Sequence, residues 1–218
     1  MRKADFERNH LEFEYWIDWY GNFLLKLIET KRVVKTKTEK LELVEALELR
    51  CATRWEVLVS ADLIAGLNRD PSVYADSVGL RLRKHLSRDE SEAMIIGHRY
   101  LDFKSVGDSK RFAKKYLVSQ YNPFQAITSK MEKRIDEFMT MRNLLAHYSH
   151  YAWRSYRKMM TRKYFYERVP EPGAFLITVN RRTGYYRWSE YLDNFLHCSE
   201  KMRETTTSSL HPTLPGMY

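Results

Sequence analysis

Cysteine, glycine and proline are scarce in this chain. Its 218 residues include two cysteines, Cys51 and Cys198, which lie far apart and lack the spacing of metal ligands. This argues against a disulfide framework and indicates a reducing compartment. The eight glycines and six prolines are few for an all-β protein. Leu, Glu, Lys and Arg dominate long stretches instead, which favours helix.

Long hydrophobic runs are also missing. No segment is apolar over the length that would cross a bilayer. The first residues, 1 to 8, include basic side chains but not the apolar region of a signal peptide. We therefore expect a cytoplasmic protein with no membrane partner. With 44% hydrophobic residues, the chain is long enough to bury one well-packed core.

The first part of the chain has the pattern of two long helices. Apolar residues recur at three-and-four spacing from about residue 3 to 31 and from about 41 to 63, on either side of a lysine- and threonine-rich link. This predicts an antiparallel helix pair. Farther on, Ser87 and Glu90 form a capping box, and Asp108 and Asn122 are predicted helix caps. The predicted apolar face of the second helix is Leu41, Val44, Leu47, Cys51, Trp55, Leu58 and Leu63.

The pattern changes after residue 168. Two short runs rich in β-branched and aromatic residues, 175–179 and 185–188, flank a turn-like segment and predict a β-hairpin. A final helix and a Thr-, Ser- and Pro-rich end follow. We therefore expect a mainly α protein, an antiparallel helical bundle with a small C-terminal β-hairpin and a final helix. The expected division is a helical domain at 1–168, the hairpin and the helix packed on it at 169–204, and a flexible tail at 205–218.

The positive charge is concentrated late in the chain. The formal net charge is +9, and the stretch from Arg142 to Arg168 has seven basic residues against one acid, interleaved with Tyr and Trp. Cations track a nucleic-acid backbone and aromatic faces stack on bases. This predicts an RNA-binding surface, and the alternative is a solvated helix face whose aromatics pack inward. The predicted RNA contacts are Arg154, Arg157, Lys158 and Arg162.

A six-residue motif, Arg-Asn-Leu-Leu-Ala-His at 142–147, ends the helix before the basic stretch. An apolar stripe along that helix leads to Arg142, so a guanidinium is predicted at a core position, where it needs a partner or a use. Arg and His at this spacing are common by chance, and the context is what makes the pair informative. The preceding stripe is Met131, Ile135, Phe138 and Met139.

With these residues the chain resembles the HEPN superfamily of helical domains, in particular the RiboL-PSP-HEPN group of bacterial ribonuclease domains. Their mark is an Arg, a polar residue, a short spacer and a His, which Arg142, Asn143 and His147 match. The resemblance covers roughly residues 40 to 168. Its other carriers are Trp55-Glu56, Leu67-Asn68-Arg69-Asp70, Gly97-His98-Arg99-Tyr100-Leu101-Asp102-Phe103 and Asn122-Pro123-Phe124.

The resemblance implies a HEPN-type bundle and an endoribonuclease that needs neither a metal nor another cofactor and acts as a homodimer. The two motifs would meet across the two-fold axis. It also implies a toxin or phage-defence (abortive infection) role, with an antitoxin or defence-system partner. HEPN toxins that are silenced by nucleotidylation bear a Tyr two residues after the His. Here Ser149 has that place and Tyr148 adjoins the His, which argues against a nucleotidyltransferase antitoxin.

The chemistry of the motif is consistent with this. Cleavage without metal uses the 2′-hydroxyl as nucleophile and needs proton transfer and positive charge at the phosphorane. His147 suits acid-base catalysis, Arg142 suits transition-state stabilisation, and Asn143 suits positioning of the phosphate or of the Arg. On an ideal helix Arg142 and His147 are about 140° apart, so a second copy is expected to complete the site.

Three further residues are candidates for support of the site, namely Glu56, Tyr148 and His150. A structural alternative remains, in which Arg142 pairs with a carboxylate between helices and His147 caps a helix C-terminus. Two functional alternatives also remain. One is a non-catalytic HEPN-like module that binds nucleotide or RNA, and the other is an interaction subunit of a defence complex.

Overall fold

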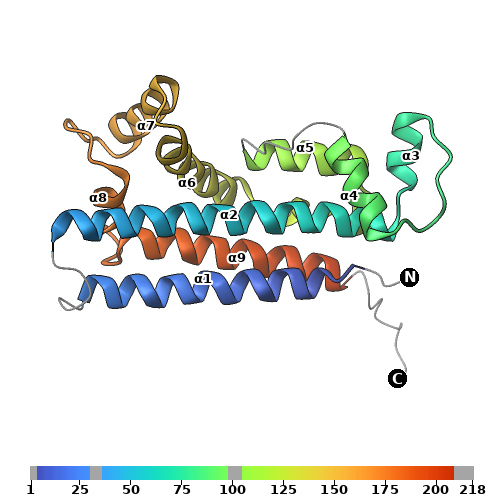
Figure 1. Cartoon of the computed structure of the whole chain (residues 1–218), viewed down its shortest axis with the longest axis horizontal. Helices are drawn as coiled ribbons and strands as arrows, with labels where there is room; N and C mark the ends of the chain where they lie inside the picture. The colour runs from blue at the N-terminus through green and yellow to red at the C-terminus, as the bar shows by residue number, and fades with distance from the viewer. Residues whose placement is uncertain (1–3, 30–35, 98–104, 209–218) are drawn as a thin grey trace. The chain divides into compact units, whose positions relative to one another are not determined.

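The computed structural model describes residues 4–29, 36–97 and 105–208 of the chain (Figure 1). Over these residues the protein is mainly helical and contains no β-sheet, so the expected mainly α class is confirmed. The elements are α1 (Phe6–Glu29), α2 (Lys37–Arg69), α3 (Ser72–Val78), α4 (Arg88–Gly97), α5 (Val106–Tyr116), the 3-10 turns η1 (Ser119–Tyr121) and η2 (Pro123–Ala126), α6 (Ser129–His147), α7 (His150–Lys163), α8 (Pro172–Leu176) and α9 (Arg187–Ser208).

The chain packs into two compact units. The first unit is Met1–Phe13, Glu56–Glu132 and His197–Tyr218, and the second unit is Glu14–Trp55 and Lys133–Leu196. Helices α1, α2 and α9 therefore contribute to both units.

The first unit is held by buried polar contacts as well as by its apolar core. The Asn68 side chain accepts the Ala4 N–H at 2.8 Å and donates to the Leu86 carbonyl at 2.7 Å. Gly66 lies against Leu117, and a Cβ at this position would stand 2.9 Å from the Leu117 methyl groups. Only glycine allows that close approach without a shift of the neighbour.

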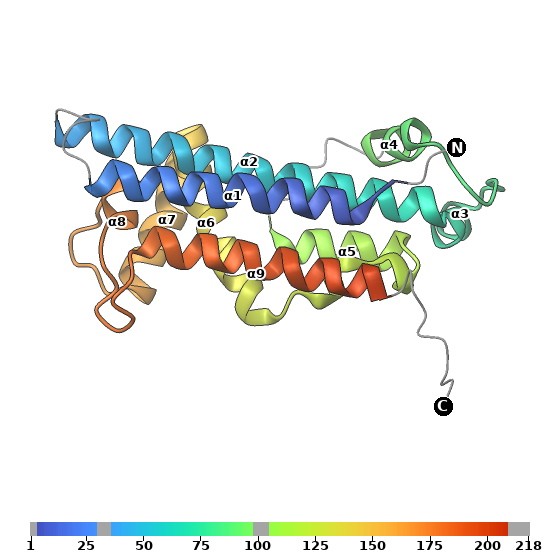
Figure 2. The ribbon, with the colours of Figure 1, turned by 90° about the horizontal axis from the view of Figure 1, so that it is seen from below.

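The second unit packs the C-terminal part of α1 and the N-terminal parts of α2 and α9 with most of α6 and with α7 and α8. Within it, α1, α2 and α9 lie side by side (Figures 1 and 2). Aromatic rings fill the space between the helices. The Phe195 ring is 5.4 Å from the Trp55 ring and 5.0 Å from the Phe138 ring. Such edge and tilted ring pairs add to the free energy of burial itself.

The predicted β-hairpin at 175–188 is wrong. Pro172 begins a helical turn, α8, because proline is preorganised for the first helical position. This turn buries Phe175 and Leu176. The last two residues of the second predicted strand, Arg187 and Trp188, belong to the start of α9. Of the predicted strand pairing, the structure contains one antiparallel bridge, between Val179 and Tyr186.

The structure confirms some of the predicted helix caps and boundaries and contradicts others. The Ser87–Glu90 capping box is confirmed, with the Ser87 N–H donating to the Glu90 carboxylate at 2.6 Å. The predicted cap at Asp108 is wrong, because the Ser105 hydroxyl accepts the Asp108 N–H and caps α5. Helix α9 continues through Ser208, into the segment expected to be a tail. The run Gly97 to Phe103 lies, apart from the backbone of Gly97, outside the described residues, as does the tail beyond Ser208.

Candidate nucleic-acid interface

Helices α6 and α7 are joined by a tight turn of two residues (Figure 1). Helix α6 ends at His147, and Tyr148 then adopts a left-handed backbone, with φ of 43°. The Ser149 hydroxyl accepts the Ala152 N–H at 3.2 Å and so caps α7. The turn brings the end of the motif directly to the first turn of the basic helix.

The motif occupies the last turns of α6 in the second unit. Arg142 is half-buried, and its Nη1 donates to the Asn143 side-chain oxygen at 3.0 Å. The His147 side chain is exposed. The apolar stripe passes through buried Met141 and Leu144 and leaves Arg142 at its border. The expectation that Arg142 replaces a core residue is therefore wrong, since the pattern alone did not fix the phase of the buried face.

Helix α6 is unbroken from Ser129 to His147. Arg142 and His147 are five residues apart on it, which corresponds to about 140° around the helix axis. Asn143 and His147 are one turn apart and share a face. In one copy, Arg142 and His147 therefore leave the helix in different directions.

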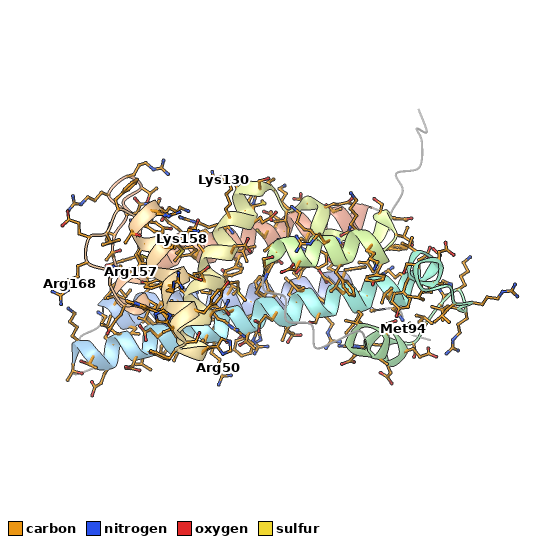
Figure 3. The ribbon with its side chains drawn as sticks, turned by 90° about the horizontal axis from the view of Figure 1, so that it is seen from above. Arg50, Met94, Lys130, Arg157, Lys158 and Arg168 are labelled. Atoms are coloured by element: carbon orange, nitrogen blue, oxygen red, sulfur yellow. The ribbon has the colours of Figure 1, made fainter. Side chains whose placement is uncertain are left out.

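The four predicted RNA contacts lie together on α7. The helix buries Ala152, Tyr156 and Met160 on one side, and its opposite side lines an open groove of about 600 Å³. Figure 3 shows Arg157 and Lys158 among the side chains of this part of the second unit. The groove is lined by Tyr151, Arg154, Ser155, Arg157, Lys158, Thr161 and Arg162.

The cations of this groove are exposed, and none of the four has a carboxylate partner among the described residues. Arg154 and Lys158 are one turn apart, as are Lys158 and Arg162. Like charges at this spacing lower helix stability by roughly 0.2–0.5 kcal/mol per pair. The helix thus holds a concentration of positive charge that its own fold does not neutralise, and a phosphate backbone would supply the missing counter-charge.

The other side of α7 is firmly attached to the second unit. The Tyr156 hydroxyl donates to the Pro170 carbonyl at 2.8 Å. At the far end, Lys163 and the Tyr164 hydroxyl both contact the Glu137 carboxylate of α6, and the Tyr164 hydroxyl lies 2.8 Å from that of Tyr191. Burial is the main cause that raises the pKa of Tyr164 to about 12. These contacts present the cationic face on a rigid support.

The three supporting candidates have different positions. Tyr148 and His150 are exposed beside His147, in the turn and at the start of α7. Glu56 is a half-buried residue of α2 in the first unit, whereas the motif belongs to the second. A role for Glu56 at the site stays a prediction.

Sequence reasoning missed a buried polar cluster in the first unit. His10 Nδ1 is 2.8 Å from the Ser199 hydroxyl, and His10 Nε2 is 3.0 Å from the Asp62 carboxylate. The same three residue types form a hydrolytic triad, but here the two ring nitrogens have exchanged partners relative to it, and all three side chains are 0% exposed, so no substrate can reach the hydroxyl. The signal that could have found it is the position of His10 on the apolar stripe between Phe6 and Phe13.

Within the described ranges, no group of three or more His, Cys, Asp or Glu side chains could hold a metal ion. No helix in that part of the chain has both the length and the apolar character that a bilayer crossing requires.

Comparison with known proteins adds no relative to this description. No family model matches the chain, and neither the curated proteins nor the solved structures include a match. The fold class is that of a mainly α protein, and its candidate functional features are the motif of α6 and the cationic groove of α7.

Proposed function

We propose that this chain is a metal-independent endoribonuclease that cleaves RNA by attack of the 2′-hydroxyl, and that two copies form the active site. The observation that carries the proposal is the unneutralised cationic face of α7, a helix that begins three residues after His147. The resemblance of 142–147 to the HEPN motif supports the reaction class. A cytoplasmic toxin or phage-defence effector, restrained by an antitoxin or a defence-system partner, is the role that this activity suits.

Each motif residue has a distinct part in the proposed reaction. His147 is exposed at the end of α6 and can exchange a proton with the 2′-hydroxyl or the leaving oxygen. Arg142 stabilises the charge of the phosphorane. Asn143 accepts the Arg142 guanidinium at 3.0 Å and so orients it. The cations of α7 lead the RNA strand to this point.

The second copy follows from the geometry of α6. Because Arg142 and His147 diverge by about 140° on one helix, a single copy does not direct both at one phosphate. Two copies related by a two-fold axis can bring His147 of one to Arg142 of the other. The proposal therefore predicts one scissile phosphate per dimer.

The same divergence favours a second candidate, an RNA-binding module without cleavage. In that case the α7 groove is the functional surface, and Arg142 is a structural residue paired with Asn143. The two candidates share the groove and differ in the role of His147.

Incubation of the purified protein with labelled RNA in EDTA separates them. The nuclease is expected to cut under these conditions, and His147→Ala is expected to slow cleavage by about 10²–10⁴-fold. Arg142→Ala is expected to lower the rate as well. The matched control is His197→Ala, which removes an exposed histidine from α9 that forms only a surface ion pair with Glu200; it should cut at the parent's rate.

Each outcome has a clear meaning. Cleavage by His147→Ala and Arg142→Ala at the parent's rate would contradict the site. If the parent does not cut but binds RNA with a steep salt dependence, the binding module is the function. If it neither cuts nor binds, both candidates fail.

A further inference from the structure

Both ends of α7 carry an aromatic residue in an unfavourable backbone conformation. Tyr148 has φ of 43° and Phe165 has φ of 56°, and they are the only non-glycine residues with positive φ in the described part of the chain. Tyr148 directly precedes the N-cap of α7, and Phe165 directly follows its C-cap residue, Tyr164. L-residues with a large side chain rarely adopt this region, because the Cβ meets the carbonyl oxygen.

Packing does not explain either residue. The Tyr148 side chain is 75% exposed and that of Phe165 is 83% exposed. Their neighbours behave differently, since the Tyr164 ring lies 4.7 Å from the Phe175 ring and Tyr156 is fully buried. A left-handed residue just after a helix is a common way to end it, and the Tyr148 N–H donates to the Leu144 carbonyl at 2.9 Å. Glycine usually fills such a position, so a large ring held in water there is a cost that helix capping does not require, and such strain is typical of functional positions.

In the sequence, the two rings flank the helix that lines the cationic groove. Between them lie the unneutralised cations of α7 and a third exposed ring, Tyr151, which lines the groove. Phe165 lies 17 positions after Tyr148 along mostly helical chain, a distance of about 25 Å at 1.5 Å per residue. A stacked strand rises about 3.4 Å per nucleotide, so this distance corresponds to about seven nucleotides.

The surroundings of Tyr148 favour a base over a phosphate. Its pKa is raised, first by partial burial and then by the charges of Glu45, Glu42 and Glu171. These carboxylates repel a phosphate at the phenol. The ring face can still stack on a base, because every base has a π face and stacking needs no charge.

We propose that Tyr148 and Phe165 are base-stacking platforms at the two ends of the α7 groove, and that they select an unpaired strand over a duplex. The inference rests on the proposed RNA function and adds the residues that distinguish an unpaired strand from a duplex. Bases in a duplex are stacked on one another and offer no free face, whereas an unpaired strand lays its bases on the rings and its phosphates on the cations.

Glycine substitution at the two positions gives a sharp test. Tyr148→Gly and Phe165→Gly remove the ring and also relieve the backbone, since glycine adopts positive φ freely. The probe is a fluorescent ten-nucleotide 2′-O-methyl adenosine strand, which has no free 2′-hydroxyl and is not cut, and the same strand annealed to its complement. The control is Tyr185→Gly, which removes an exposed ring at a position without positive φ.

We expect the parent to bind the single strand more tightly than the duplex. Each glycine variant at 148 or 165 should bind the single strand about 5- to 100-fold more weakly, while its urea midpoint stays equal to the parent's or rises. Tyr185→Gly should bind as the parent does, with a urea midpoint that is unchanged or lower. Weaker binding together with higher stability is the result that a structural role cannot produce.

Three results would overturn the inference. The first is tight binding of the single strand by the parent and both variants, which leaves the proposed nuclease function to be judged by the cleavage assay. The second is weaker binding with a lower urea midpoint, which makes the residues structural. The third is that the parent binds phosphatidylserine vesicles and no RNA, which assigns the rings and cations to a membrane surface and also contradicts the proposed function.

Discussion

Glu48 is a buried acidic residue whose lost hydration is not replaced by hydrogen bonds. Its side chain is 2% exposed, and neither carboxylate oxygen has a hydrogen-bond partner. Burial, and then the charge of Glu45, raise the pKa of Glu48 well above its ordinary value. The folded state therefore keeps the proton to a higher pH than the unfolded chain does. Because the folded state binds more protons, the contribution of Glu48 to stability falls as the pH rises above the unfolded pKa.

Replacement of this carboxyl by an apolar side chain should stabilise the protein. We expect Glu48→Met to raise the free energy of unfolding by about 1–3 kcal/mol at pH 7, and by less at pH 4, where the carboxyl is largely neutral in both states. Urea unfolding at the two pH values measures the effect. Glu48→Gln is the control, because it abolishes the pH dependence but leaves a buried polar group. A lower stability of Glu48→Met at pH 7 would contradict this account.

Glu48 also marks a limit of sequence reasoning at this scale. The periodic pattern of α2 placed Leu47 on the buried face with Val44 and Cys51, whereas the structure leaves Leu47 half-buried and buries Glu48. A shift of one residue is about 100° around the helix, and the packed neighbours, not the pattern, fix it. The motif residues Arg142, Asn143 and His147 could be located from sequence, but not the exposure of His147 or the strain at Phe165.

Among the elements, α7 is the clearest case in which sequence and structure agree. Its basic residues were predicted as one surface and lie on one face, because their spacing follows the helical repeat. The hairpin shows the opposite. The run at 175–179 has β-forming residues, yet Pro172 and the burial of Phe175 and Leu176 favour a helical turn. Tertiary packing overrides β propensity in so short a segment.

Neutralisation of two α7 cations should weaken RNA binding without loss of stability. For Arg157→Gln with Lys158→Gln, the slope of log binding constant against log salt concentration should become shallower by about 1.5 to 2. The urea midpoint should stay the same or rise slightly, because like charges are removed. Fluorescence anisotropy between low and moderate salt measures the slope.

The matched control pairs Arg81→Gln with Lys84→Gln, which removes two exposed charges from the first unit. It should leave the slope unchanged. An equal loss of slope in both double variants would mean that net charge, and not the α7 groove, governs binding.

The attachment of α7 depends on Glu137. This carboxylate of α6 contacts Lys163 and the hydroxyls of Tyr164 and Tyr191. We expect Glu137→Ala to lower the free energy of unfolding by about 2–4 kcal/mol, since it leaves several partly buried donors without an acceptor. Urea unfolding measures it. Glu200→Ala removes the carboxylate of an exposed ion pair on α9 and should change stability by less than about 0.5 kcal/mol. Equal effects of the two substitutions would contradict the anchoring role.

For the whole molecule, the central question is whether one copy or two make the site. The second unit holds the motif and the groove together, but α6 directs Arg142 and His147 apart. A nuclease built this way has to combine side chains from different copies, and its activity becomes a property of the assembly. The helical angle suggests a shared site from the sequence alone, and the unbroken α6 favours it further, because a bent helix end would allow a single-copy site.

Mixing of two inactive variants tests the two-copy site directly. Arg142→Ala retains His147, and His147→Ala retains Arg142, so a mixed dimer has one intact copy of each residue. If the site combines them across the two-fold axis, co-expressed variants should cut RNA in EDTA well above the rate of either variant alone. Each variant co-expressed with the double variant, Arg142→Ala with His147→Ala, is the control and should gain nothing. Sedimentation at the assay concentration should show a dimer. A monomer that cuts RNA, or mixed dimers as inactive as the controls, would contradict a site shared between copies.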